Sequence, residues 1–472
     1  MANTPLDGTS SSSSSSSADI VPLVWLSASL AALAGLMFGL DIGVISGALG
    51  LIKEEFHVST LTEGWIVSSM MGGAAVGALA AGWVSNRLGR KNALLLSSVL
   101  FFIGALVVAM APSVEVIIVG RIFLGLAVGV ASFTAPLYLS EIAPERIRGT
   151  MISFYQLMVT VGILAAFVSG LAFSYIHSWR GMFGILCVPS AVLFIGVLLV
   201  PNSPRWLASR DRFDEAKEVL GKLRASRAEV EKEMNEITAA VNSDDHTSGW
   251  KLLARNRNFR RSVALGIGLQ LVQQFTGMNA MMYFAPRIFE QTGFGSEAQL
   301  WSTVLVGLVN VLATMIAIGF VDRLGRKPML YIGFAVMAGG LAVVAAIMGI
   351  GASTSFLQFT ALIALLVFVA GFAMSAGPLI WTLCSEIQPL AGRDFGISCS
   401  TFANWASNMA LGAFFLLMLN NLGGPVTFSI MCVCNLLYIV FTWAFVPETK
   451  GVSLEHIERN LMAGKPLRQI GR

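Results

Sequence analysis

Long apolar stretches alternate with short polar segments along nearly the whole chain. A helix needs about 20 apolar residues to cross the hydrocarbon core of a bilayer, so each long stretch is a candidate membrane span. The predicted spans cover residues 22–50, 62–83, 92–111, 114–139, 150–174, 180–200, 261–290, 299–321, 329–350, 357–384, 394–420 and 425–446. The pattern therefore predicts an all-α membrane protein with twelve transmembrane helices.

The composition agrees with a protein that lies in the membrane. Of the 472 residues, 55% are hydrophobic and only 12% are charged, and the mean hydropathy is +0.74. Soluble domains carry about a quarter charged residues. A net charge of +4 raises the alternative of a nucleic-acid partner. We expect no nucleic acid, because the basic residues lie in short loops between spans, and the expected partner surface is a lipid bilayer.

Short polar motifs occur twice along the chain, once in each half and in the same order. The pairs are Arg-Leu-Gly-Arg-Lys at 87–91 and 323–327, the Glu-Ile motifs at 141–149 and 386–393, and, more weakly, the proline motifs at 201–206 and 447–450. Three echoes in one order predict two similar halves. Membrane proteins with two such halves often move one half against the other around a central site.

The distribution of Lys and Arg predicts the orientation of the chain. Basic residues concentrate after the even-numbered spans and in the C-terminal segment. Cytoplasmic loops carry this excess, so both termini are expected in the cytoplasm. The predicted parts are a disordered cytoplasmic tail at 1–20, an N-terminal six-helix bundle at 21–200, a cytoplasmic helical linker at 201–258, a C-terminal six-helix bundle at 259–446 and a cytoplasmic C-terminal tail at 447–472.

Asp41 and Arg121 are charged residues inside predicted spans. A charged side chain at mid-membrane costs about 2.5–3.5 kcal/mol on insertion scales, so such residues usually have a function. Two interpretations of Asp41 are open: a structural acid paired permanently with Arg121, or a proton carrier. Burial favours a neutral carboxyl group and a nearby cation favours a charged one, so a moving Arg121 would switch the proton affinity. We favour the proton carrier over a sodium site, because one carboxylate beside a cation is a poor cation cage.

Most other polar side chains inside the spans are amides, and tryptophans accompany them. Amides donate and accept hydrogen bonds, as hydroxyl groups do, and an indole covers the apolar face of a sugar ring. The set favours a neutral polyhydroxylated ligand; the alternative is hydrogen bonding between helices. A helix break at Gly277 would let the amides of span seven face one cavity. The set is Gln156, Gln270, Gln273, Gln274, Asn279, Asn310, Trp381, Asn404 and Trp405.

Signatures of other chemistry are missing from the sequence. It has no phosphate-binding loop for ATP and no HExxH zinc motif, so we expect no enzyme, no metal site and no cofactor. Glu141 and Glu386 lie at the predicted cytoplasmic ends of spans, within reach of the basic loops. We interpret them as members of ion pairs that lock a cytoplasmic gate.

The repeated loop motif resembles the signature of the major facilitator superfamily, and the proline motifs resemble those of its sugar porters. The segments that resemble bacterial galactose–proton and arabinose–proton symporters are 277–279, 376–381, 385–389 and 452–459. The resemblance implies two pseudo-symmetric six-helix bundles in the bacterial inner (plasma) membrane. It implies proton-coupled symport of a monosaccharide, a hexose or pentose such as galactose, glucose or arabinose, into the cell by alternating access. The proton gradient would supply the energy without a cofactor, and we expect a monomer.

The resemblance also implies roles for individual residues. Asp41 would carry the proton and Arg121 would control it. The sugar site would be lined by Gln156, Gln273, Gln274, Asn279, Asn310, Trp381 and Asn404, with Trp405 in support. The cytoplasmic gate would consist of Arg90, Glu141, Arg148, Arg326, Glu386 and Arg393.

Three positions depart from the family pattern. Asn86 replaces the Asp of the first loop motif, which predicts a weaker gate in the first half, and Asn202 stands where Glu is common. Ala373 occupies a position at which facilitative glucose carriers have Glu. With Asp41 present, this favours symport over the alternative, a facilitative sugar uniporter without proton coupling. A non-transporting sugar receptor is a further alternative, which the short C-terminal tail disfavours.

Overall fold

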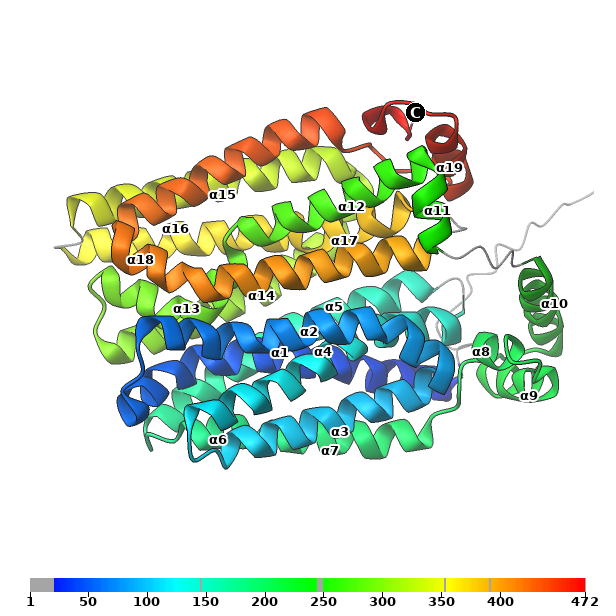
Figure 1. The fold of residues 1–472 in the computed structure, drawn as a ribbon, viewed down its shortest axis with the longest axis horizontal. Helices are drawn as coiled ribbons and strands as arrows, with labels where there is room; N and C mark the ends of the chain where they lie inside the picture. Colours follow the sequence, from blue (N-terminus) through cyan, green and yellow to red (C-terminus); the bar gives the residue numbers. More distant parts are fainter. Residues whose placement is uncertain (1–20, 145–146, 244–248, 352–353, 390–391, 472) are drawn as a thin grey trace, which may run out of the picture.

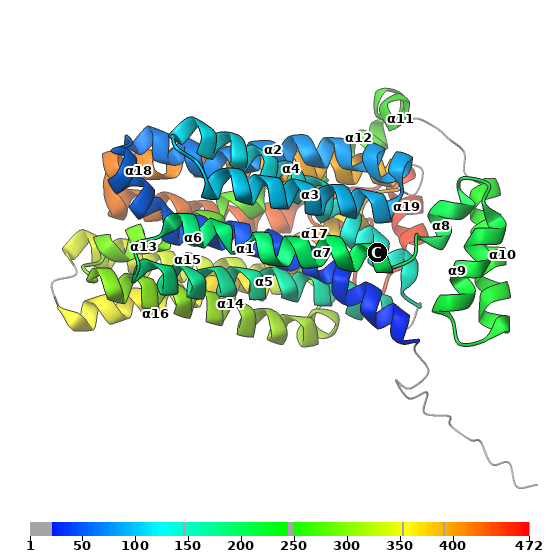
Figure 2. The ribbon, with the colours of Figure 1, turned by 90° about the horizontal axis from the view of Figure 1, so that it is seen from below.

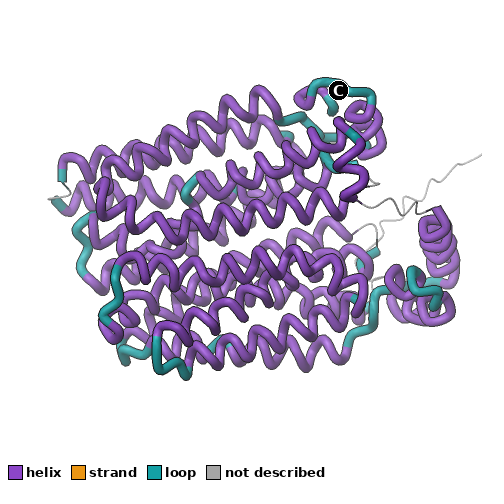
Figure 3. The backbone as a smooth tube through the Cα atoms, in the orientation of Figure 1, coloured by secondary structure: helices purple, strands orange, loops and turns teal. Residues whose placement is uncertain are grey.

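The computed structural model describes residues 21–144, 147–243, 249–351, 354–389 and 392–471. These residues form helices and connecting turns, and no strand occurs among them (Figure 3). The predicted serine-rich tail at 1–20 lies outside the described residues. Within the described part of the chain, ten helical segments are long and apolar enough to cross a membrane.

The first half of the chain folds into one helical bundle (Figure 1). It consists of α1 (Pro22–Phe56), α2 (Thr60–Leu88), α3 (Arg90–Ala109), α4 (Val114–Ile142), α5 (Arg148–Ser174), α6 (Trp179–Gly184) and α7 (Cys187–Leu199). The short α6 and α7 together form the sixth crossing. Small residues let these helices approach closely: a Cβ atom on Gly125 of α4 would lie 1.9 Å from the carbonyl oxygen of Met70 in α2.

The second half forms a second bundle beside the first (Figure 1). It consists of α12 (Arg257–Phe275), α13 (Met278–Gln291), α14 (Ser296–Leu324), α15 (Arg326–Ile350), α16 (Ser355–Ala373), α17 (Ala376–Glu386) and α18 (Arg393–Phe445). α12 and α13 share one crossing, and α16 and α17 share another. α18 has 53 residues but turns back at Gly423, where φ is 80°, so it supplies two crossings. The described residues therefore make the twelve crossings that the hydropathy pattern predicts.

The repeated loop motif has the same backbone geometry in both halves. Gly89 joins α2 to α3 with φ 88° and ψ 159°, and Gly325 joins α14 to α15 with φ 91° and ψ 162°. A side chain is disfavoured at such positive φ values, which explains glycine at both positions. The match supports the pseudo-symmetry that the sequence echoes predict.

The remaining helices gather at one end of the two bundles, here named the linker end (Figures 1 and 2). They are α8 (Pro204–Ala208), α9 (Phe213–Leu223), α10 (Arg227–Ser243), α11 (Gly249–Arg255), α19 (Leu454–Met462) and the 3₁₀ helix η4 (Leu467–Gln469). Arg224 connects this region to the first bundle. Its Nη1 donates to the carbonyl of Ile142 at the end of α4 at 2.9 Å, and its Nε donates to Glu233 of α10 at 2.6 Å. The other end of the bundles is named the opposite end.

The two proline motifs occupy corresponding places at the linker end. The indole of Trp206 covers Gly89, and its Nε1 donates to the carbonyl of Asn86 at 2.7 Å. In the second half, the Glu448 carboxylate lies against Gly325 and accepts the backbone N–H groups of the first two residues of α15 at 3.0 and 2.9 Å. The two proline motifs, which resemble each other only weakly in sequence, therefore both lie against the glycine of the repeated loop in their own half.

Candidate functional site

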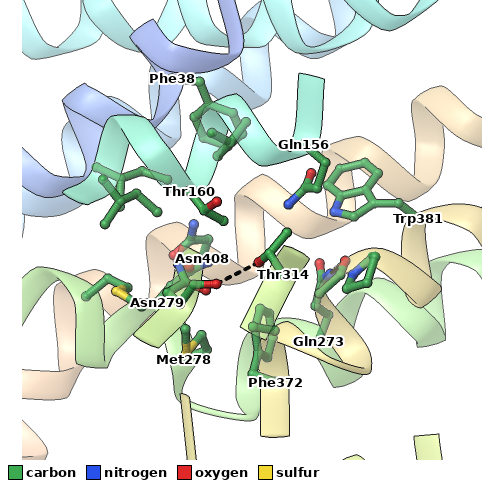
Figure 4. A pocket seen from close by; sticks show the side chains of 18 of the residues that line it. Phe38, Gln156, Thr160, Gln273, Met278, Asn279, Thr314, Phe372, Trp381 and Asn408 are labelled. Atoms are coloured by element: carbon green, nitrogen blue, oxygen red, sulfur yellow. Dashed lines mark hydrogen bonds between the residues drawn. The ribbon is translucent and has the colours of Figure 1, made fainter. Parts of the chain in front are cut away.

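A polar cavity lies between the two bundles, lined by residues near the middle of α1, α5 and α14 and by residues of α12, α13 and α16 to α18 (Figure 4). Its wall includes every amide and tryptophan side chain that the resemblance implies for a sugar site. These are Gln156, Gln273, Gln274, Asn279, Asn310, Trp381, Asn404 and Trp405. Residues from both halves of the chain therefore face one space.

The break at Gly277 brings the amides of the seventh crossing together. Gly277 has φ 94°, so α12 ends at Phe275 and α13 begins at Met278 with a new direction. On an unbroken helix Asn279 would point roughly 120–140° away from Gln273 and Gln274. Here all three line the cavity, and Nδ2 of Asn279 donates to Oε1 of Gln274 at 2.5 Å. The predicted consequence of this break is confirmed.

Two of the amides also hold helices together. Nε2 of Gln273 donates to the carbonyls of Ala376 and Gly377 at 3.0 and 3.1 Å, where the tenth crossing is interrupted between α16 and α17. Nδ2 of Asn404 donates to Oε1 of Gln273 at 2.8 Å and to Oε1 of Gln270 at 2.6 Å. Gln270 is not part of the cavity wall, so for this residue the alternative of helix–helix hydrogen bonding describes the observed contacts.

Aromatic rings supply the apolar part of the wall. Phe38 of α1, Phe372 of α16 and Trp381 of α17 line the cavity together with Trp405. The rings of Phe38 and Trp405 pack across the interface between the bundles with centroids 5.4 Å apart. The Trp405 side chain is nearly fully buried, and its Nε1 has no hydrogen-bond partner among the described residues. Rings beside amides provide both kinds of surface that a sugar presents.

Three polar residues of the cavity wall were missed in the sequence. They are Thr160, Thr314 and Asn408. Each lies four residues after a predicted member of the site on the same helix: Gln156, Asn310 and Asn404. Residues four apart share one helix face, so this spacing was the available signal.

Asp41 and Arg121 lie together inside the first bundle. Nη1 of Arg121 is 3.6 Å from Oδ1 of Asp41, and neither side chain is exposed. Neither carboxylate oxygen of Asp41 accepts a hydrogen bond from the described residues, whereas Nη2 of Arg121 donates to the carbonyl of Val67 at 3.3 Å. The pair is therefore loose, because the two charges lie close together without a hydrogen bond between them. Asp41 is adjacent in sequence to Ile42, which lines the cavity.

At the linker end, the structure pairs four of the six residues that the resemblance assigns to a gate. Arg90 contacts both carboxylate oxygens of Glu141 at 2.8 Å, and Arg326 donates to Glu386 at 3.1 Å. Each pair lies within one bundle. Nη2 of Arg393 donates to the carbonyl of Gln388 at 3.4 Å. No ion pair to a carboxylate is observed for Arg393 or Arg148 among the described residues.

At the opposite end, an ion pair joins the two bundles. Glu63 of α2 is almost fully buried and contacts Lys53 of α1 at 2.6 Å and Arg287 of α13 at 3.5 Å. Arg287 also bonds Glu290 at 2.9 Å. Among the ion pairs of the described residues that connect transmembrane helices, the Glu63–Arg287 pair crosses between the two halves. An electrostatic contact therefore joins the two bundles at the opposite end.

Two pseudo-symmetric bundles with a polar cavity at their interface define the class of membrane transporters that work by rocking around a central site. A family model described as "Sugar (and other) transporter" matches residues 27–461. The chain belongs to this family of sugar transporters.

Individual relatives agree with this assignment. The chain is 58% identical over 443 residues to the galactose-proton symporter of Escherichia coli K12, with 94% of this chain and 95% of the relative covered. It is 52% identical over 445 residues to the arabinose-proton symporter of the same strain, with 93% and 94% covered. The structure matches a partially occluded inward-open conformation of the E. coli xylose transporter XylE with a TM-score of 0.81 and 30% identity, covering 92% of this chain and 100% of the other.

These matches confirm three expectations from the sequence. The resemblance to the sugar porters is confirmed, as is the fold class of twelve transmembrane helices in two pseudo-symmetric bundles. The relatives are transporters, so the protein is a transporter and not an enzyme.

Proposed function

We propose that this protein couples the entry of a monosaccharide into the cell to the entry of a proton. The observation that carries the proposal is the loose, fully buried pair of Asp41 and Arg121 close to an amide-lined cavity. The names of the two relatives, a galactose-proton and an arabinose-proton symporter, point to the same activity.

The sugar would bind in the cavity between the bundles. Gln156, Gln274, Asn279 and Asn310 supply groups that donate and accept hydrogen bonds, as sugar hydroxyls require. The indole rings of Trp381 and Trp405 would cover the apolar face of the ring. Gln273 and Asn404 would hold the wall in shape through the hydrogen bonds between them.

The proton would bind to Asp41. A neutral Asp41 no longer attracts Arg121, so protonation frees the guanidinium to change partners. Because both side chains are fully buried, the local dielectric constant is low and the change in attraction is large. The proton gradient is then the only energy source that the transport cycle needs, without a cofactor.

Alternating access would follow from rocking of the two bundles. With the linker end in the cytoplasm, the Glu63–Arg287 contact closes the outer side, and the parting of this contact would admit sugar and proton from outside. The intrabundle pairs Arg90–Glu141 and Arg326–Glu386 would hold the loops of the inner gate. In this proposal both termini lie in the cytoplasm, and the protein works as a monomer in the bacterial inner membrane.

The test is uptake of labelled galactose and arabinose into de-energised vesicles, with and without an imposed inward proton gradient. A membrane potential of 100 mV supplies about 2.3 kcal/mol per charge, so one proton per sugar supports roughly fiftyfold accumulation. We expect accumulation with wild type and its loss with Asp41→Asn, while exchange of sugar across the membrane continues. Equilibration without accumulation in wild type would contradict the proposal and identify a facilitative uniporter.

A further inference from the structure

The break of the seventh crossing leaves a backbone carbonyl without its helical partner. In a continuous helix the carbonyl of Thr276 would accept the N–H of Ala280, four residues later. α12 ends at Phe275 and α13 begins at Met278, and this bond is not observed among the described residues. Thr276 is fully buried, so its carbonyl needs a donor from elsewhere in the protein.

Asn435 of the last crossing supplies this donor. It lies in α18, beyond the turn at Gly423, and its side chain is fully buried. Its Nδ2 donates to the carbonyl of Thr276 at 3.2 Å and to the carbonyl of Met431, one turn earlier in α18, at 2.9 Å. The amide of Asn435 therefore takes the place of the Ala280 N–H group.

Met431 contacts the break beside Asn435. The two residues are four apart on α18 and therefore share one helix face. A Cβ atom on Gly277 would lie 2.7 Å from Sδ of Met431, so the sulfur packs directly against this glycine. Neither Asn435 nor Met431 is among the residues that line the cavity. The last crossing therefore holds the break from outside the cavity.

The amide of Asn435 is unfavourable for stability alone. Its Oδ1 is buried and has no hydrogen-bond partner among the described residues. A buried polar atom without a partner destabilises the folded state, and a leucine of similar size would carry no such atom. Stability alone therefore does not explain a polar side chain at this position, whereas the donor directed at the break does.

We propose that Asn435 is a positioning residue that keeps the seventh crossing in its broken, sugar-binding form. This inference rests on the proposed sugar site. In the broken form Asn279 faces the cavity together with Gln273 and Gln274, and on a continuous helix it would point roughly 120–140° away from them. The Asn435 amide and the N–H of Ala280 compete for one carbonyl, so Asn435 stabilises the broken form relative to the continuous one.

The consequence is that sugar affinity depends on a residue that does not touch the sugar. The apparent affinity is the intrinsic affinity multiplied by the fraction of protein in the binding-competent form. Loss of the Asn435 donor lowers the fraction in the broken form. When the two forms are close in free energy, one hydrogen bond changes their ratio about two- to tenfold.

The test is equilibrium binding of labelled galactose to the purified full-length protein, with Kd and the number of binding sites measured separately. Asn435→Leu keeps the size of the side chain and Asn435→Ala shortens it, and both remove the donor. We expect both variants to raise Kd about two- to tenfold with an unchanged number of sites. Because Asn435→Leu also removes the unpaired Oδ1, its Tm should be equal to or higher than that of wild type.

The matched controls are Thr427→Val and Thr442→Val. Both hydroxyl groups are buried in the last crossing and have no hydrogen-bond partner among the described residues. These variants should keep the wild-type Kd. A role of Asn435 in folding alone would give the opposite pattern, with a lower Tm and fewer sites in Asn435→Leu at the wild-type Kd. That result, or a raised Kd in only one of the two Asn435 variants, would overturn the inference.

The wild-type protein separates this inference from the proposed function. If wild type binds galactose and accumulates it under a proton gradient while both Asn435 variants keep the wild-type Kd, the role of Asn435 is wrong and symport stands. If wild type binds neither galactose nor arabinose, the proposed sugar site fails, and the inference fails with it.

Discussion

Glu448 is expected to hold the C-terminal segment on the second bundle and to cap α15. Its carboxylate accepts the backbone N–H groups of Arg326 at 3.0 Å, Lys327 at 2.9 Å and Lys450 at 3.0 Å. The first two groups belong to the start of α15, where backbone N–H groups have no partner within the helix. The substitution Glu448→Gln keeps the size of the side chain and replaces one acceptor oxygen by an NH₂ group.

The expected loss follows from these contacts. One hydrogen bond to a charged acceptor contributes about 1.5–3 kcal/mol. The attraction between a carboxylate and a helix N-terminus contributes about 0.3–1 kcal/mol. The two terms together give about 2–4 kcal/mol. For a unit of about 150–250 residues, each kcal/mol changes Tm by about 2–4 °C, so Glu448→Gln should lower Tm by roughly 4–16 °C if the second bundle unfolds as a unit.

The assay is thermal unfolding of the detergent-solubilised protein, with Asn202→Ala as the matched control. Asn202 occupies the corresponding place in the first half, and its Oδ1 has no hydrogen-bond partner among the described residues. Its removal should change the free energy of unfolding by less than about 0.5 kcal/mol, or Tm by less than about 2 °C. A Glu448→Gln shift as small as that of the control would refute the capping argument.

Three further predictions concern the ion pairs and the helix break. Glu141→Gln leaves Arg90 buried without its countercharge and should destabilise the protein by about 3–5 kcal/mol, measured as a lower Tm than wild type; an unchanged Tm would contradict it. Gly277→Ala places a side chain at φ 94° and should weaken galactose binding about five- to thirtyfold, measured by equilibrium binding, because a strain of about 1–2 kcal/mol falls on the cavity wall. Arg287→Gln removes the contact with Glu63 and should increase sugar binding from the opposite end about two- to fivefold, measured in oriented vesicles. Binding equal to that of wild type would show that this ion pair does not hold the opposite end closed.

Much of the fold could be predicted from the sequence, because the hydropathy of a segment and the presence of a glycine determine local structure. The spans follow from the length of apolar stretches, and Gly277 predicted the break that turns Asn279 toward Gln273 and Gln274. The glycine at 423 was a weaker signal for the turn between the last two crossings, because helical sequence continues on both sides of it. The amides of the cavity were predictable as a group, since polar side chains inside spans are few and therefore conspicuous.

The contacts between distant segments were not readable. Asn408 looks like an ordinary helix amide until its neighbour Tyr283 is known, and the pairing of Glu63 with Arg287 depends on how the bundles approach each other at the opposite end. Ion pairs between moving halves depend on the conformation that the protein adopts, and a sequence encodes several conformations at once.

The two halves share a backbone but not the chemistry that secures it. Gly89 and Gly325 have almost the same dihedral angles, yet an indole covers the first and a carboxylate covers the second. The contact of Trp206 depends on apolar packing and one hydrogen bond to a carbonyl, which salt screens little. The contact of Glu448 depends on charge, which salt weakens where solvent reaches it. We therefore expect the linker ends of the two bundles to respond differently to ionic strength, even though the fold is pseudo-symmetric.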